Sequence, residues 1–102
     1  MYRLLISELA HQDLDQIAKY IAEDLLNQRA ALDFLDEVEI CFNYIKDNPM
    51  IYARCNDKRL DAEGYRKAVI KKYIVVYKVS EIDTIVTVLR FFFGAQDYAK
   101  LI

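Results

Sequence analysis

The stretch YRKAVIKKYIVVYKV, residues 65–79, decides the fold of this chain. From Tyr73 to Val79 its residues alternate between two sets, Tyr and Val at the odd positions and Ile, Val and Lys at the even ones. Such a strand presents apolar side chains on nearly both faces. It is therefore expected at the centre of a sheet, covered by helices on one face and by another layer on the other. Lys71 and Lys72 are the predicted tip of the hairpin that precedes it.

The segments before this strand predict a strand and a helical hairpin. Tyr2–Ile6 is short and β-compatible, and Ser7 can cap the helix that follows. That helix should run for about 17–19 residues. Its apolar positions recur at three- and four-residue intervals, at Leu14, Ile17, Ile21 and Leu25, whereas Asp13, Asp15 and Lys19 lie on its polar side. A second helix starts after a break at Asn27-Gln28 and stops before Pro49, because the residue before proline disfavours helical geometry.

The remaining segments predict a meander of strands. Residues 50–64 are rich in Asn, Asp, Lys and Arg and are predicted to be irregular. Residues 80–83 form the next turn, and residues 84–92 form the last strand. The predicted fold is α+β, with an N-terminal helical hairpin packed on a small, mostly antiparallel sheet.

Size and composition predict a single domain spanning residues 1–102. Hydrophobic residues make up 55% of the chain and charged residues 29%, as in a compact, ordered domain. Charges interrupt the apolar stretches, so no membrane span is expected. Cys41 and Cys55 have no metal-ligand spacing, and they are expected to be free thiols. These features predict a cytoplasmic protein without a cofactor or metal.

The charge is distributed unevenly along the chain. Residues 1–50 hold 4 Lys and Arg against 10 Asp and Glu, and residues 51–102 hold 10 against 6. This polarity is compatible with one face for a cationic partner and another for an acidic one, or with a solvated surface.

The order of elements and the residue pattern together resemble the RelE/ParE superfamily of toxins from type II toxin–antitoxin modules, in the plasmid stabilisation family and nearer its ParE branch. The resemblance covers nearly the whole chain. The residues that carry it are Ala10, Asp13, Leu14, Ile17, Tyr20 and Ile21 in the first helix, Ile45 and Pro49 at the end of the second, Leu60, Gly64-Tyr65-Arg66, the strand from Tyr73 to Tyr77, Val88-Leu89-Arg90, and Asp97-Tyr98.

The resemblance implies a toxin held in check by a cognate antitoxin, with one of two targets. One branch of the superfamily cleaves mRNA in the ribosome, and the ParE branch inhibits DNA gyrase. The nuclease branch needs cations on the concave face of the sheet to stabilise the charge of the phosphorane. The resemblance places three of its polar positions at apolar residues here, Ile74, Phe93 and Ala95.

If the chain were a nuclease, its catalytic residues would have to be the polar candidates that remain, Arg66, Arg90 and Tyr98. Arg66 could bind a phosphate or pair with an acidic neighbour on the exposed face of the sheet. Arg90 could pack against an aromatic ring, and Tyr98 could be a general acid or base or pack its ring. His11 has no second histidine in the chain with which to form a catalytic or metal site.

The stretch RFFFGAQDY, residues 90–98, favours an interface over a nuclease site. Alternation sends one or two of the three phenylalanine rings into the core and leaves the rest as an apolar ledge, which suits protein recognition. The residues predicted to bind the target or the antitoxin are Arg59, Arg66, Lys67, Phe92, Phe93 and Tyr98. A groove between the two helices is also expected to accept an amphipathic helix of the antitoxin.

The sequence and the resemblance leave three alternative functions. The favoured one is a ParE-like toxin that blocks DNA gyrase. The second is a ribosome-dependent mRNA endonuclease with a basic set drawn from Arg54, Lys58, Arg59, Arg66 and Lys67. The third is a degraded homologue that acts only in a complex with its antitoxin.

Overall fold

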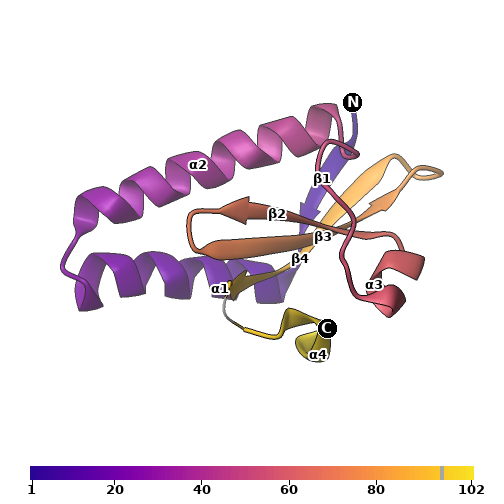
Figure 1. The fold of residues 1–102 in the computed structure, drawn as a ribbon. Coiled ribbons are helices and arrows are strands. Elements are labelled where there is room, and N and C mark those ends of the chain that lie inside the picture. The colour runs from indigo at the N-terminus through magenta and orange to yellow at the C-terminus, as the bar shows by residue number, and fades with distance from the viewer. Residues whose placement is uncertain (95) are drawn as a thin grey trace.

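The computed structural model describes residues 1–94 and 96–102 and forms a helical hairpin on a four-stranded sheet (Figure 1). Ala95, one of the three apolar positions singled out above, lies outside the described residues. The strand order is β1-β4-β3-β2, with β1 parallel to β4 and the other neighbours antiparallel. The elements are β1 (Arg3–Ile6), α1 (Glu8–Lys19), the π-helical turn η1 (Tyr20–Asp24), α2 (Gln28–Asp47), α3 (Lys58–Ala62), β2 (Tyr65–Ile70), β3 (Tyr73–Ser80), β4 (Ile85–Phe93) and α4 (Tyr98–Leu101). The predicted α+β class is confirmed.

The helix boundaries follow the capping residues that the sequence indicates. The Ser7 hydroxyl accepts a hydrogen bond from the Ala10 amide at 3.0 Å, and the Asn27 side chain accepts one from Ala30 at 3.0 Å. At the other end, α2 stops at Asp47, two residues before Pro49. Among the described residues, no helix has both the length and the apolar character needed to cross a membrane.

Strand β3 is central and buried on both faces, as predicted. Val75 and Tyr77 face α1 and α2 in the main core, which also contains Phe34 and Val38 of α2. The opposite face of the sheet, called the outer face below, carries a second core. Its buried residues are Cys55, Leu60, Ile74, Val76 and Phe92.

The outer layer is a short helix in the segment that the sequence predicts to be irregular. That prediction is wrong for residues 58–62, which form α3 with the Asp57 carboxylate accepting a hydrogen bond from the Leu60 amide at 3.1 Å. Leu60 and Cys55 are buried against the sheet. The apolar outer face of β3 has to be covered, and this need for burial organises a polar segment.

A β-bulge in β4 determines which core each of the following phenylalanine rings faces. Arg90 pairs with Val76 and Val88 with Tyr77, so Leu89 is an extra residue in the strand. Because of this insertion, Val88 and Phe91 both reach the main core, and Phe92 enters the outer core. Phe93 is 46% exposed, so the expected apolar ledge consists of this one ring.

The buried hydroxyl of Tyr77 gives a first testable expectation. It donates a hydrogen bond to the Pro49 carbonyl at 2.7 Å, and Tyr77→Phe leaves that carbonyl without its donor. We expect a loss of about 1–2 kcal/mol in the free energy of unfolding, measured by urea denaturation at neutral pH. The matched variant Tyr44→Phe, at an exposed position, should change stability by less than about 0.5 kcal/mol. Equal losses in the two variants would contradict the buried hydrogen bond.

Tyr77 also makes the stability of the fold depend on pH in the alkaline range. Burial raises the pKa of the Tyr77 hydroxyl above its ordinary value. The unfolded chain then loses this proton at lower pH than the folded chain, so stability falls as the pH rises above about 10. The Tyr77→Phe variant should lose part of this alkaline decline.

Candidate functional site

The outer face of the sheet carries the residues that bear on the choice between a nuclease and a binding protein. Ile74, at the position of the nuclease arginine, is buried in the outer core. Partly buried residues of α4 and of the chain end, Tyr98, Ala99 and Ile102, pack against the same core. Figure 1 shows α3 and α4 close together on the side of the sheet away from α2. The C-terminal helix therefore covers this part of the outer face.

Arg59 and Lys67 both contact the C-terminal segment. The Arg59 guanidinium donates hydrogen bonds to the carbonyls of Ala99 at 2.9 Å and Ile102 at 3.1 Å. The Lys67 ammonium lies 5.5 Å from the centre of the Tyr98 ring, whose other neighbour is the Phe92 ring at 6.2 Å. The structure thus brings together four of the six predicted interface residues, Arg59, Lys67, Phe92 and Tyr98.

Arg66 does not belong to this group. The sequence interpretation placed it on the exposed face of the sheet, and this is wrong. Arg66 pairs with Tyr77 in the sheet register and donates a hydrogen bond to the Tyr52 carbonyl at 2.7 Å, on the face that packs against α2. The strand alternation that buries Ala68 and Ile70 on that face carries Arg66 with them. Arg54, another candidate of the nuclease set, forms an ion pair with Asp61 at 3.5 Å.

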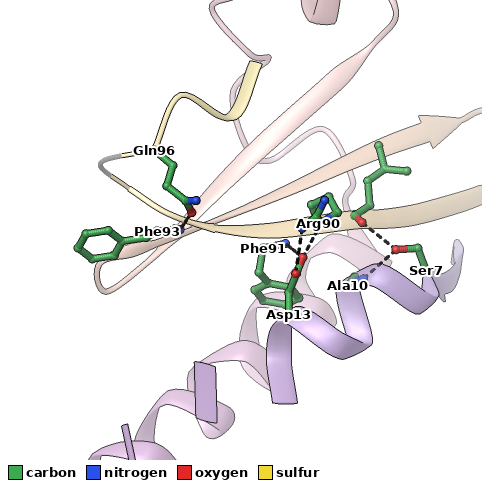
Figure 2. A network of polar contacts seen from close by, with 8 residues as sticks. Ser7, Ala10, Asp13, Arg90, Phe91, Phe93 and Gln96 are labelled. Carbon is green, nitrogen blue, oxygen red and sulfur yellow. Dashed lines mark hydrogen bonds and ion pairs between the residues drawn. The ribbon is translucent and has the colours of Figure 1, made fainter. Parts of the chain in front are cut away.

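Arg90 is held in a polar network that links β4 to α1 (Figure 2). Its Nε and terminal nitrogen donate to the two Asp13 carboxylate oxygens at 2.7 and 3.1 Å, and the Phe91 amide donates to the same carboxylate at 3.0 Å. The hydrogen bonds between Arg90 and Asp13 raise the pKa of Arg90 above its ordinary value. The guanidinium also lies 5.2 Å from the Phe92 ring, as the aromatic packing interpretation predicted.

The sequence interpretation assigned Asp13 to the polar, solvated side of the first helix, and this is wrong. The Asp13 side chain is only 13% exposed because it turns toward β4 and accepts three hydrogen bonds. Its place beside the apolar Leu14 and Ile17 carried no signal of a partner 77 residues further along the chain. An alignment with covarying positions would be the signal that could reveal such a pair.

Two grooves lie on the outer flanks of the helical hairpin, whereas the sequence interpretation expected a groove between its two helices. The α1–β4 groove has a volume of about 440 Å³, and the α2–β2 groove about 280 Å³. The α1–β4 groove is lined by Asp13, Gln16, Ile17, Tyr20, Tyr73, Arg90, Phe91, Phe92, Phe93, Gln96 and Leu101. The α2–β2 groove is lined by Glu37, Ile40, Cys41, Tyr44, Tyr52, Val69, Ile70 and Lys71. Most of the side chains that line either groove are apolar or aromatic, so both suit a protein segment.

The electrostatics of the α1–β4 groove are close to neutral. Among the described residues that line it, Arg90 is the one cation, and the Asp13 carboxylate pairs with it. The other polar lining groups are the amides of Gln16 and Gln96 and the hydroxyls of Tyr20 and Tyr73. A phosphate group entering this groove would meet a cation that already has its counter-charge.

Comparison with known proteins gives one family and several similar folds. The model of a family described as the ParE toxin of the type II toxin–antitoxin system parDE matches residues 4–98. No curated protein matches the chain.

Among solved structures, a chain of the chromosomal ParDE system from P. aeruginosa is 17% identical, with a TM-score of 0.71 over 91% of this chain and 96% of that one. A chain of the RelBE2 complex from Mycobacterium tuberculosis is 19% identical, with a TM-score of 0.63 over 90% of this chain and 96% of that one. The isolated E. coli RelE toxin is 14% identical, with a TM-score of 0.65 over 99% of this chain and 95% of that one. At these identities the three structures establish a shared fold.

Proposed function

Because the chain belongs to the ParE toxin family of type II toxin–antitoxin systems, we propose that it arrests growth by binding DNA gyrase and that a cognate antitoxin neutralises it. The proposed place of action is the cytoplasm, where gyrase and the antitoxin would meet it. Toxin–antitoxin complexes among the structures of similar fold support an antitoxin partner.

The main support for a toxin that does not cleave RNA is that Ile74 is buried under the C-terminal segment. Phosphoryl transfer would require cations free to contact the phosphate on this face. Arg59 instead holds backbone carbonyls of the C-terminal segment, and the Lys67 ammonium faces the Tyr98 ring. The neighbouring α1–β4 groove is lined mostly by apolar and aromatic residues, and this composition favours a protein target.

A direct test uses the purified chain with DNA gyrase and with a translating extract. We expect the chain to inhibit supercoiling or to raise the amount of gyrase-linked DNA breaks, and we expect primer extension to detect no new cuts in translated mRNA. Addition of the product of the reading frame adjacent to its gene should reverse the effect on gyrase. Position-specific mRNA cuts without any effect on gyrase would overturn the choice of target.

The second candidate, an mRNA endonuclease, draws on one observation. Lys67 lies beside the Tyr98 ring, so a cation and a hydroxyl-bearing residue are neighbours on the outer face. If this pair were catalytic, Tyr98→Phe should abolish cleavage of translated mRNA, because the variant keeps the ring and loses only the hydroxyl. The third candidate, a degraded homologue, predicts normal growth when the chain is expressed without its antitoxin.

A further inference from the structure

Strand β2 is the outermost strand on its side of the sheet, and only the first part of its free edge is covered. The Lys67 amide donates to the Ala53 carbonyl at 3.1 Å, and the Tyr65 carbonyl accepts from the Cys55 amide at 3.0 Å. In an antiparallel pair, alternate residues direct their backbone groups to the same edge, so Val69 continues this series. Among the described residues, none forms a hydrogen bond with the Val69 backbone on that side. The part of β2 around Val69, called the open edge below, therefore presents one backbone donor and one acceptor.

The two lysines that flank the open edge are directed away from it. Natural edge strands avoid pairing with other chains mainly through charged side chains, above all lysine. Lys67 and Lys71 lie two residues to either side of Val69. However, the Lys71 ammonium lies 3.6 Å from the Glu37 carboxylate of α2, and the Lys67 ammonium lies over the Tyr98 ring on the outer face. The usual protection against strand pairing is thus missing at the open edge.

Apolar side chains border the open edge on both faces of the sheet. Ala68 and Ile70 face α2 in the main core, so the side chain of Val69 points to the opposite face, where it is 66% exposed. On the other side, Ile40 and Tyr44 of α2 line the α2–β2 groove, and each is more than half exposed. An added strand would satisfy the Val69 backbone and cover apolar surface at the same time.

The charges of this surface favour a second copy of the chain as the occupant. Glu37 and Lys71 are the two charged residues among the described residues of the α2–β2 groove, and they neutralise each other. Two copies that meet here bring no net charge together, whereas a strongly basic or acidic segment would find no opposite charge. The exposed side of α2 is different, because Asp36 and Glu39 would there face the same carboxylates of a second copy.

Two-fold symmetry lets one open edge complete another. When β2 pairs antiparallel with β2 of a second copy, the donor and acceptor of Val69 in each copy meet backbone groups of the other. The hairpin between β2 and β3 points away from α3 (Figure 1). The two hairpins can therefore lie side by side, with the covered start of each β2 outside the contact.

We propose that the chain forms a symmetric dimer through the open edge of β2, which joins the two four-stranded sheets into one. Ile40 and Tyr44 of the two α2 helices pack beside the junction. The open edge is short, so the interface is small and the dissociation constant is expected to be about 1–100 µM. This inference concerns the free chain and depends neither on gyrase nor on an antitoxin.

A matched pair of variants tests the edge by sedimentation equilibrium at protein concentrations of about 1 µM to 1 mM. Val69→Lys puts a charge on the open edge of both copies, and we expect the dissociation constant to rise by about 30-fold or more. Ile82→Lys is the control, because Ile82 is 96% exposed in the turn between β3 and β4. It should change the dissociation constant by less than about threefold. Circular dichroism checks that both variants are folded.

A second pair of variants tests the charge balance. Glu37→Lys leaves Lys71 without its counter-charge and gives the α2–β2 groove of each copy two positive charges. The dissociation constant of the dimer should then rise by at least about tenfold. Asp36→Lys makes the same change of charge one residue away, outside the groove, and its effect should stay below about threefold.

Amide exchange locates the contact in the unaltered chain. Hydrogen exchange of the Val69 amide, followed by NMR, should slow by at least about tenfold between a dilute monomeric sample and a concentrated dimeric one. The Lys67 amide already donates to Ala53 within the chain, so its exchange should change less than that of Val69.

The outcomes separate this inference from the proposed function. A chain that remains monomeric at about 1 mM overturns the dimer. A dimer that Val69→Lys does not weaken, or in which Val69 exchange is unchanged, overturns the open edge as its interface. If the chain is monomeric and Val69→Lys instead weakens the complex with the product of the adjacent reading frame, the edge binds another protein and the inference is wrong. None of these results bears on the gyrase assay, and failure of that assay leaves the dimer standing.

Discussion

Leu60→Ala should lower the free energy of unfolding by about 2–5 kcal/mol, the largest effect that we expect from a single substitution in this chain. Leu60 is fully buried and is the residue of α3 that enters the outer core beside Ile74, Val76 and Phe92. Its truncation removes apolar contacts and leaves a cavity between α3 and the sheet. Urea denaturation monitored by circular dichroism gives the loss.

The matched control for this substitution is Leu32→Ala. Leu32 is also helical but is 60% exposed, so its truncation should cost less than about 0.5 kcal/mol. Tyr98, Ala99 and Ile102 pack on the same core as Leu60, so hydrogen exchange in the C-terminal segment should speed up in Leu60→Ala. A cost below about 1 kcal/mol would mean that the outer core does not hold α3 and α4 on the sheet.

Asp13→Ala should lower the free energy of unfolding by about 2–3 kcal/mol. The variant removes three hydrogen bonds at once and leaves the Arg90 guanidinium and the Phe91 amide without their acceptor. Arg90 is 29% exposed, so water partly replaces the lost carboxylate. We therefore expect a smaller loss than the 3–5 kcal/mol typical of breaking a fully buried pair.

Asp15→Ala is the control for this prediction, because Asp15 lies two residues along the same helix and is exposed. It should change stability by less than about 0.5 kcal/mol. A double-mutant cycle with Arg90→Met should give a coupling energy above about 1 kcal/mol, since the two side chains interact directly. Additive effects of the two substitutions would contradict the ion pair.

The sequence was sufficient for the elements whose signals are local. Alternation in residues 73–79 predicted a central strand with two buried faces, and β3 has both. Ser7 and Pro49 predicted the start of α1 and the end of α2, because capping and the restriction before proline act within a few residues.

The candidate site was predicted in part. Arg59, Lys67, Phe92 and Tyr98 were named from the sequence, and they do gather around α4. The sequence interpretation put Arg66 on the wrong face, and it did not identify Gln96 or Tyr20 as part of a groove. Only the path of the chain brings the side chains of α1 next to the end of β4.

The sequence by itself determined the α+β order of elements, the two-faced central strand and the family of toxins to which the chain belongs. The tertiary structure alone decided the bulge at Leu89, which puts Phe91 rather than Phe92 in the same core as Val88, and the pairing of Asp13 with Arg90. The physical reason is the range of the interactions. Capping and alternation depend on neighbouring residues, whereas strand register and a salt bridge spanning 77 residues depend on the packing of the whole chain.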